Sequence, residues 1–312
     1  MPDVTIVDTS PRDGQVALPS IGTKGKIALA NSLIQSGLTK IDCVGFTHPR
    51  IRPEFADAEK VISAVAKKPG IVTLGIAPNE VACRRALATD IDEIGTLISG
   101  SESFTRSVLG ISIRETLYKT FPAIFQACRE KNRSIRVYIL SAFSCQYEGR
   151  IPLNDIVDLA CKLSFMGADE LSLVDTPGQA NPSQVRETIH ALLDQNLKTR
   201  IAVHFHNTRG LGLVNCLAAY EAGVRIFDTA IGGLSGTPFG APAMQAGSWN
   251  VPTEDLVYLF HEMGVNTAIN LDTLLDSVKL AQNLVRRELF GHALNASTAF
   301  RSSNFPEPLT LN

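Results

Sequence analysis

The sequence predicts an α/β protein, a closed (β/α)8 barrel with extra helices at its C-terminus. Eight short apolar segments alternate along the chain with eight longer amphipathic segments. The apolar segments are rich in Val and Ile and do not alternate strictly with polar residues, which is typical of parallel strands covered on both faces. Eight such β-then-α units in succession favour a closed barrel over an open sheet.

The predicted strands and helices alternate along the chain. Strands are expected at 4–8, 40–46, 71–77, 91–98, 135–141, 170–175, 200–206 and 225–231. The helices after them are expected at 24–35, 53–65, 78–87, 112–130, 153–166, 182–195, 212–222 and 252–263.

The chain divides into two predicted parts. No change in composition marks a boundary before about residue 270, so residues 1–270 are assigned to one TIM-barrel catalytic domain. Residues 271–289 read as one or two further helices, and the tail from Gly291 is mixed in composition. Residues 271–312 are therefore assigned to a C-terminal helical extension and tail. The tail from Gly291 is either partly disordered or covers the barrel mouth or a neighbouring subunit.

The composition excludes several classes of function. The chain has 312 residues, 29 basic and 31 acidic, and a net charge of -2, without a basic stripe for nucleic acid or an anionic membrane. No apolar segment approaches the roughly 20 residues of a membrane span, and the N-terminus does not read as a signal peptide. The six cysteines form no CxxC pair, which indicates reduced, mostly buried thiols in a cytoplasmic protein.

Polar residues concentrate where the predicted strands end. Barrel enzymes carry their chemistry at the C-terminal ends of the strands. We therefore consider these residues together as one candidate site: Arg12 and Asp13 after the first strand, Asp42 in the second, Asp175 in the sixth, His204 and His206 in the seventh, and Asn250 after the eighth.

The two histidines give the sharpest signal. Residues i and i+2 of a strand point to the same face, so His204 and His206 can both face the barrel mouth and bind one cation. The alternative is a hydrogen-bonded structural pair, and the acidic residues at other strand ends favour the metal-binding interpretation. Imidazole with carboxylate, amide and water oxygens suits Mg²⁺, Mn²⁺, Fe²⁺ or Zn²⁺. No cysteine lies beside the pair, which argues against a structural zinc site.

Two carboxylates and one loop have two interpretations each. Asp42 and Asp175 are either functional or structural groups paired with an arginine, for which Arg12 is a candidate, because a buried carboxylate needs a partner. The glycine-rich segment 232–240 is either a plain turn or a lid over the substrate.

The motifs resemble those of a known family. Ser-Pro-Arg-Asp-Gly at 10–14, His-Phe-His-Asn at 204–207 and Gly-Leu-Ser-Gly at 233–236 resemble the metal-dependent DRE-TIM lyase and synthase superfamily, and within it the 3-hydroxy-3-methylglutaryl-CoA lyases. Further similar segments lie at 100–104, 147–149, 172–176 and 250–255. The likeness covers about residues 4–270.

The resemblance implies roles for particular residues. Asp13, His204, His206 and Asn250 would ligate a divalent cation, Mg²⁺ or Mn²⁺, with Zn²⁺ as a further option. Arg12 would stabilise an enolate oxygen, Asp42 would support the metal and substrate, and Asp175 would be an active-site acid. The substrate and CoA are expected near Gln15, and near Ser101, Glu102, Ser103 and Arg106 in the segment 99–106. Relatives are commonly dimers or larger, so a homo-oligomer is expected.

The chain also departs from the family pattern. The lyases carry a proton-exchanging cysteine directly after the glycine-rich motif, where this chain has Thr237, and no cysteine follows Cys216. A thiol with a pKa of ~8.5 exchanges protons near neutrality, whereas a threonine hydroxyl needs strong activation. The segment Leu-Gln-Asn-Glu of the lyases is replaced by Gln-Val-Ala-Leu at 15–18.

The activity implied is a retro-Claisen or retro-aldol cleavage of a 3-hydroxy-3-methylglutaryl-CoA-like or citramalyl-CoA-like thioester, which yields an acyl-CoA and a keto acid. The enolate proton would come from Asp175, from water relayed by Thr237, or from His292. Two other classes compete: a condensing synthase or CoA-independent aldolase, and a non-catalytic homologue that keeps the metal.

Overall fold

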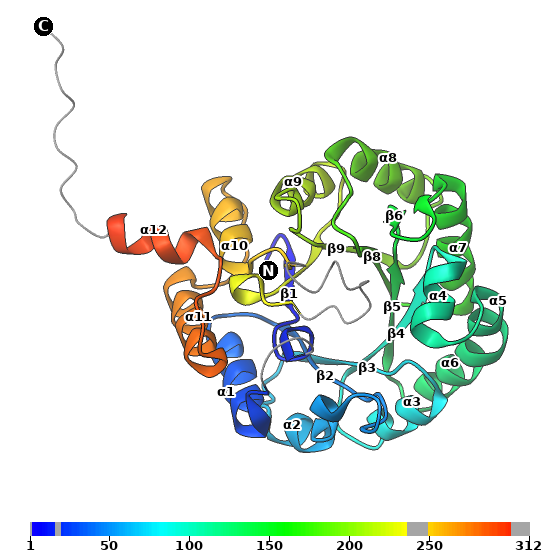
Figure 1. The fold of residues 1–312 in the computed structure, drawn as a ribbon, viewed down its shortest axis with the longest axis horizontal. Helices are drawn as coiled ribbons and strands as arrows, with labels where there is room; N and C mark the ends of the chain where they lie inside the picture. Colours follow the sequence, from blue (N-terminus) through cyan, green and yellow to red (C-terminus); the bar gives the residue numbers. More distant parts are fainter. Residues whose placement is uncertain (1, 16–19, 236–248, 301–312) are drawn as a thin grey trace, which may run out of the picture.

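The computed structural model describes residues 2–15, 20–235 and 249–300, and it contains a closed barrel of eight parallel strands (Figure 1). Around the barrel the strand order is β1-β10-β9-β8-β5-β4-β3-β2, and β1 closes the ring by pairing with both β10 and β2. The predicted (β/α)8 fold is confirmed. The barrel strands are β1 (Thr5–Asp8), β2 (Lys40–Gly45), β3 (Val72–Ile76), β4 (Glu93–Ser99), β5 (Ser134–Leu140), β8 (Glu170–Asp175), β9 (Arg200–Phe205) and β10 (Ile226–Thr229).

One principal helix follows each barrel strand and covers its outer face. Each buries a stripe of apolar side chains, as α7 does with Ile156, Leu159, Ala160 and Leu163 at helical spacing. These helices are α1 (Gly22–Gln35), α2 (Ala58–Ala64), α3 (Glu80–Leu87), α6 (Phe121–Glu130), α7 (Leu153–Met166), α8 (Pro182–Leu193), α9 (Gly212–Glu221) and α10 (Thr253–Glu262). Several helices begin at a local signal: Asn79 and Asn181 cap α3 and α8 by accepting a hydrogen bond from a backbone N–H of the first turn.

The segment between β4 and β5 differs from the prediction of one helix at 112–130. It contains α4 (Glu102–Leu109), α5 (Ile113–Glu115), a π-helical turn η3 (Thr116–Thr120) and then α6. Ser101 caps α4, and Gly110 ends it in a left-handed conformation with φ of 72°. The short hairpin of β6 (Ser144–Cys145) and β7 (Gly149–Arg150) was also not predicted.

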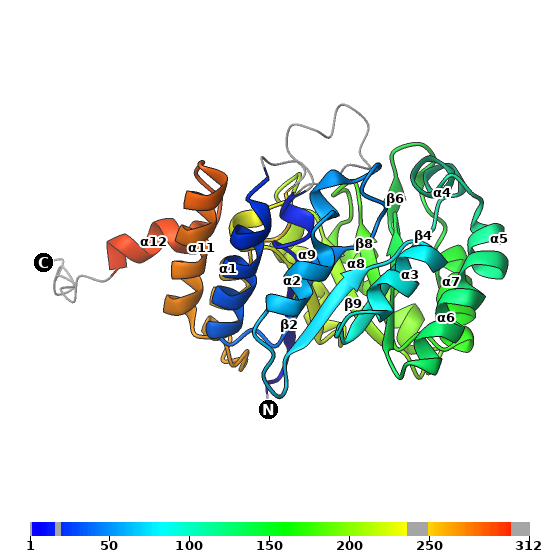
Figure 2. The same cartoon turned by 90° about the horizontal axis from the view of Figure 1, so that it is seen from below.

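Two helices follow the barrel at the C-terminal end. α11 (Leu271–Val285) packs against α1 and α10, and α12 (His292–Phe300) packs against α10 (Figures 1 and 2). The prediction of helices after residue 270 is confirmed, and α12 begins in the tail that was read as mixed. Because α11 lies directly on barrel helices, it forms part of the outer layer. The division into domains at residue 270 stays a prediction.

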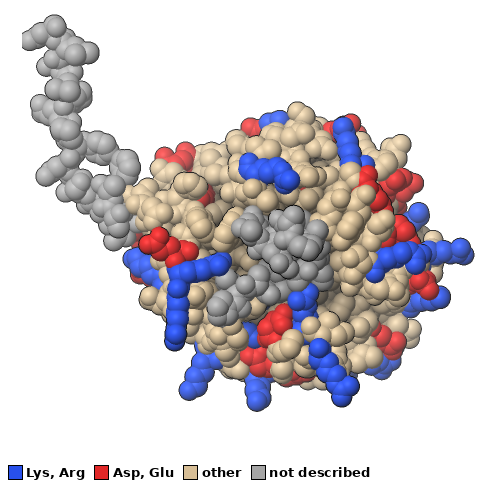
Figure 3. Space-filling view, in the orientation of Figure 1, with Lys and Arg blue, Asp and Glu red and all other residues tan. Residues whose placement is uncertain are grey.

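The surface and the cysteines agree with the sequence analysis. Acidic and basic side chains are interspersed around the rim of the face in Figure 3. Five of the six cysteines are buried and Cys161 is partly buried, as predicted. Among the helices that the structure describes, none combines the length and apolar character that a membrane crossing requires.

A buried ion network fills the inside of the barrel below its mouth. Lys40 Nζ lies 2.7 Å from Glu93 Oε2 and 2.8 Å from Glu170 Oε1. Arg136, fully buried, lies 3.0 Å from Glu170 Oε1 through Nη1 and 2.6 Å from Asp228 Oδ1 through Nη2. Ion pairs thus connect β2, β4, β5, β8 and β10 across the inside of the barrel, although β10 pairs through its backbone only with β1 and β9.

Replacing Arg136 by Met should strongly destabilise the metal-free protein. The variant leaves Glu170 and Asp228 buried with one cation fewer, and breaking a buried pair costs about 3–5 kcal/mol. Chemical denaturation would measure the free energy of unfolding. The matched control is Arg186→Met, which breaks an exposed pair with Glu221 and should cost less than about 1 kcal/mol. Equal effects of the two substitutions would contradict a structural role for the network.

Candidate metal centre

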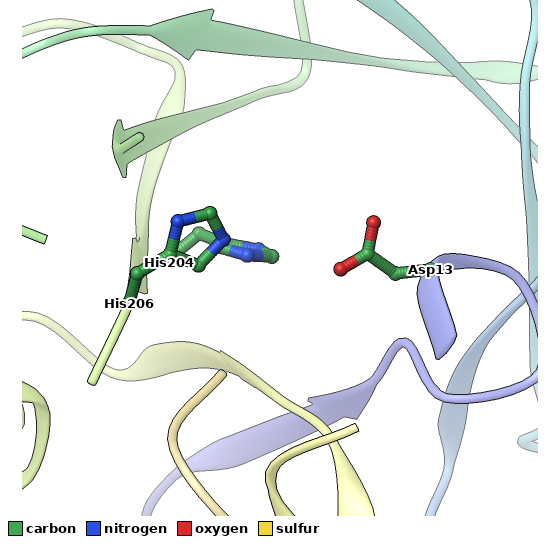
Figure 4. A group of neighbouring side chains, drawn as sticks. All are labelled: Asp13, His204 and His206. Carbon is green, nitrogen blue, oxygen red and sulfur yellow. The ribbon is translucent and has the colours of Figure 1, made fainter. Parts of the chain in front are cut away.

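Three potential metal ligands meet at the C-terminal mouth of the barrel. Asp13 lies in the short helix η1 (Asp13–Gln15) that follows β1, whereas His204 and His206 come from the end of β9. One ligand atom from each residue lies within 4.8 Å of the others, and all three side chains are buried. Figure 4 shows both imidazoles directed toward the Asp13 carboxylate. The structure therefore brings together the three ionisable groups of the predicted metal site.

Each ring directs Nδ1 to an oxygen atom that orients it, and His204 Nε2 faces the amide oxygen of Asn250. His206 Nδ1 lies 2.7 Å from the carbonyl oxygen of Thr176, which can only accept, so Nδ1 carries the proton. Burial lowers the pKa of His206 to about 4, which keeps the ring neutral. His204 Nδ1 lies 3.2 Å from Asp228 Oδ2. Carboxylate and carbonyl partners of this kind orient metal-binding histidines.

Asn250 is fixed as a fourth member of the cluster. Its Nδ2 donates to Asp13 Oδ2 at 2.8 Å and to the Leu234 carbonyl at 2.8 Å. Its Oδ1 therefore faces His204 Nε2, also at 2.8 Å. A backbone bridge between His206 and Asn250 ties this segment to the end of β9.

The donor set fits a divalent cation. Two ligand atoms that occupy neighbouring octahedral positions at about 2.1 Å from an ion lie about 3 Å apart, close to the separation of His204 Nε2 and Asn250 Oδ1. Two imidazoles, a carboxylate and an amide oxygen suit ions of intermediate hardness.

Arg12 is held beside the cluster by two carboxylates. Its Nε donates to Asp42 Oδ2 at 2.7 Å, and its Nη1 donates to Asp13 Oδ1 at 3.1 Å. Tyr138 Oη donates to the same Asp42 oxygen at 3.3 Å. Burial raises the pKa of Asp42 to about 6, although Arg12 acts against this shift. Asp42 thus lies behind Arg12 and fixes the direction of its guanidinium group.

Asp228 is a functional residue that the sequence analysis did not single out. It accepts from Ser172 Oγ at 2.9 Å and joins His204 to Arg136. Burial acts to raise the pKa of Asp228, but Arg136 and His204 outweigh it and lower the pKa to about 2. The sequence contains the same signal for Asp228 as for Asp42: each is a carboxylate inside an apolar strand.

A pocket opens directly over the cluster and has about 740 Å³ of empty space, including the part open to solvent. Arg12, Asp13, His204 and His206 form one part of its wall. The other described residues that line it are Gly45, Thr47, Arg52, Phe55, Ile76, Leu97, Tyr138, Leu140, Val174 and Thr176. Of these, Arg52 was not anticipated from the sequence.

Asp175 is not brought into the cluster. Its Oδ1 and Oδ2 accept from the backbone N–H groups of Gln179 and Ala180, at 3.0 and 2.9 Å. Asp175 is in register with Phe205, whereas Val174 is in register with His204 and lines the pocket. The carboxylate therefore holds the loop after β8. Thr237 lies outside the described residues.

The residues expected near CoA lie on α4 and have local partners. Ser101 is buried and caps the helix by accepting from Phe104 N–H. Glu102 accepts from Ile113 N–H and pairs with Arg106 at 2.8 Å. The backbone N–H of Ser103 donates to Glu148. Within the part of the chain that is described, none of these four residues lines the pocket over the metal cluster.

Gln15 lies at the end of η1, next to Asp13 along the chain. Its Oε1 accepts from Ile21 N–H at 3.4 Å, and its Nε2 is buried without a hydrogen-bond partner. The structure therefore places a spare amide donor near the site, and a role in substrate binding stays a prediction.

Comparison with known proteins places the chain in a family. The HMGL-like family model matches residues 3–281. Hydroxymethylglutaryl-CoA lyase of Bacillus subtilis is 34% identical over 92% of this chain and 94% of that protein, and the mitochondrial human enzyme is 34% identical over 88% and 83%. Among solved structures, the B. subtilis HMG-CoA lyase aligns with a TM-score of 0.89 at 34% identity, covering 96% of this chain and 100% of that chain.

An HMG-CoA lyase from Acinetobacter baumannii, solved in complex with coenzyme A and 3-methylmalate, aligns with a TM-score of 0.88 at 31% identity and covers 97% of each chain. Both the sequence relatives and these structural neighbours are lyases. The chain is therefore a lyase that belongs to the HMGL-like family.

Proposed function

We propose that this chain is a divalent-metal-dependent carbon–carbon lyase for a 3-hydroxy-3-methylglutaryl-CoA-like thioester. The observation that carries the proposal is one pocket that joins a cluster of metal ligands to a fixed arginine. The names of the relatives support an acyl group of the hydroxymethylglutaryl type. The 3-methylmalate and coenzyme A in the A. baumannii structure support a branched hydroxy diacid together with coenzyme A as the class of ligand. A citramalyl-CoA-like thioester, whose acyl group is the 2-methyl isomer, stays the second candidate of this class.

Asp13, His204, His206 and Asn250 would hold the cation. When bound, a divalent ion supplies Lewis acidity that lowers the pKa of a substrate hydroxyl. Mg²⁺ or Mn²⁺ suits the oxygen-containing donor set, and Zn²⁺ is compatible with it.

The cleavage balances as a retro-Claisen reaction. The substrate hydroxyl loses its proton, its carbon becomes the carbonyl carbon of the keto acid, and the adjacent carbon–carbon bond breaks. The electron pair of that bond passes to the thioester fragment, which leaves as an enolate and then takes up a proton to give the acyl-CoA. Arg12 stabilises the developing negative charge on the thioester oxygen, because it stays charged and its fork-shaped donors are already oriented.

The structure narrows the sources of the enolate proton among the described residues. Asp175 uses its carboxylate to hold a backbone loop. His292 lies on α12 with an exposed side chain that pairs with Asp255. Neither lines the pocket. We therefore favour water relayed by Thr237, which takes the position of the cysteine in the lyases.

Two features of the protein in the cell stay predictions. Homo-oligomerisation and a cytoplasmic location are proposed from the sequence analysis. A bacterial relative that covers most of the chain supports the second.

The first test is metal-dependent turnover. The protein should release acetyl-CoA and acetoacetate from 3-hydroxy-3-methylglutaryl-CoA, or acetyl-CoA and pyruvate from one citramalyl-CoA enantiomer, with Mg²⁺ or Mn²⁺ and not after chelation. Mass spectrometry would detect the products. Metal binding without cleavage of any of these thioesters would contradict the proposed substrate class and favour a CoA-independent substrate.

Replacing Arg12 by Gln should lower kcat about 100- to 1000-fold, because one oriented donor to a developing oxyanion contributes that much. Arg12→Lys should recover only part of the loss, since lysine keeps the charge without the fork. Steady-state kinetics would be measured together with Mn²⁺ affinity. A variant that binds Mn²⁺ normally and turns over at nearly the wild-type rate would exclude Arg12 from the chemical step.

Replacing Asp228 by Asn should weaken Mn²⁺ binding about 10- to 100-fold, because His204 loses the carboxylate that orients it. Isothermal titration calorimetry would measure the affinity. Asp92→Asn is a matched control, because Asp92 accepts from Thr73 at the start of β3, at the other end of the barrel. The two variants should differ in metal affinity, and an unchanged affinity in Asp228→Asn would show that His204 is oriented by other contacts.

A further inference from the structure

Arg52 is a second arginine in the pocket that the metal cluster and Arg12 share. It lies between the end of β2 and the short helix η2 (Pro53–Phe55), in the same connection as Thr47. Both residues line the pocket, whereas Arg50, two positions earlier, is exposed and does not line it. The side chain of Arg52 is 23% exposed, so its charge is partly removed from water.

The two arginines differ in how their charge is matched. Arg12 has carboxylate oxygens at 2.7 and 3.1 Å, from Asp42 and Asp13. Arg52 Nη1 lies 3.6 Å from Glu54 Oε1, an ion pair longer than a hydrogen bond. Arg12 is therefore fixed in one orientation by these two short contacts, and the ion pair of Arg52 with Glu54 is the longer one.

The described lining residues also include two guanidinium groups, those of Arg12 and Arg52. Arg12 already lies between the carboxylates of Asp13 and Asp42. A bidentate contact from arginine to a substrate carboxylate is among the strongest hydrogen-bonded pairs.

The rest of the wall suits the hydrocarbon part of an acyl group. Phe55, Ile76, Leu97, Leu140 and Val174 all line the pocket. A small branched acyl chain can therefore contact apolar side chains while its polar ends meet charged groups. This combination of an apolar wall with a few placed polar groups is usual for small-molecule sites.

We propose that Arg52 binds the free carboxylate of the acyl group and thereby selects thioesters that carry a second acidic group over those that end in an alkyl group. The inference rests on the proposed function, because it assigns a recognition role within the same site. Arg52 is a specificity-determining residue here, and Arg12 acts on the thioester end.

The test compares two thioesters that differ by one carboxylate and cannot be cleaved. 3-Methylglutaryl-CoA and 3-methylbutyryl-CoA both lack the hydroxyl group that cleavage requires, so binding can be measured on the metal-loaded protein without turnover. Calorimetry with Mn²⁺ should show that the wild-type protein binds 3-methylglutaryl-CoA more tightly. Arg52→Gln should weaken this binding about 10- to 100-fold, as expected for a lost hydrogen bond to a charged group, and change 3-methylbutyryl-CoA binding less than about 2-fold.

Two matched variants separate the recognition role from general effects. Arg50→Gln removes a nearby exposed arginine and should leave both affinities unchanged. Arg52→Lys should keep part of the preference, because it retains the charge and loses the planar fork. The unfolding midpoint and Mn²⁺ affinity of Arg52→Gln should match those of the wild-type protein.

The outcomes distinguish this inference from the proposed function. Equal weakening of both thioesters by Arg52→Gln would assign Arg52 to coenzyme A or to the fold and overturn the inference. Equal binding of both thioesters by the wild-type protein would overturn it as well. A preserved carboxylate preference in a protein that fails to cleave 3-hydroxy-3-methylglutaryl-CoA would support Arg52 while contradicting the proposed substrate.

Discussion

The metal centre depends on one buried carboxylate, that of Asp228. On one side it lies 3.2 Å from His204 Nδ1, and on the other it lies 2.6 Å from Arg136. An unpaired carboxylate inside a barrel would be costly, and the desolvation of Arg136 is equally unfavourable on its own. The buried charges of Asp228 and Arg136 therefore compensate each other. The Asp228 carboxylate that pairs with Arg136 is also the group that orients His204.

This arrangement connects stability and function through the barrel core. Arg136 also lies beside Glu170, and Glu170 lies beside Lys40, so the network extends from β2 through β5 and β8 to the metal ligand on β9. A core of apolar side chains alone could be more stable, since buried ion pairs often cost as much as they contribute. The charged interior instead gives the site a rigid base, because each member has short contacts that hold a single geometry.

The positions of the ligands could be predicted from the sequence because they depend on short-range geometry. The i, i+2 spacing places His204 and His206 on one face, and strand ends of a barrel converge at its mouth. The same alternation explains why Asp175 behaves differently. In the register with β9, Val174 is opposite His204, and Asp175 is opposite Phe205 on the helix-facing side. Asp175 was placed in the candidate site because it ends a predicted strand and because of the resemblance, and neither argument carries the direction of a side chain.

Other features depend on contacts that no local pattern reveals. Asp228 is recognised only once β9 and β10 are seen to pair with Asp228 in register with His204. The helix α4 was not predicted, although Ser101 and Gly110 mark its two ends. Arg52 sits in a connection rich in charge and proline, and its direction toward the pocket follows from the path of the chain between β2 and α2.

The two pocket arginines have identical side chains, but their neighbours favour different roles for them. Arg12 is held by Asp42 and Asp13, so it can meet a charge that develops during the reaction without reorganising. A donor that is already fixed contributes little to choosing among substrates whose thioester ends are alike. Arg52 lines the same pocket and is proposed to meet the free carboxylate of the acyl group. In this proposal rate and selectivity depend on different cations in one pocket, so a change in acyl specificity can occur at position 52 while the proposed metal ligands stay the same.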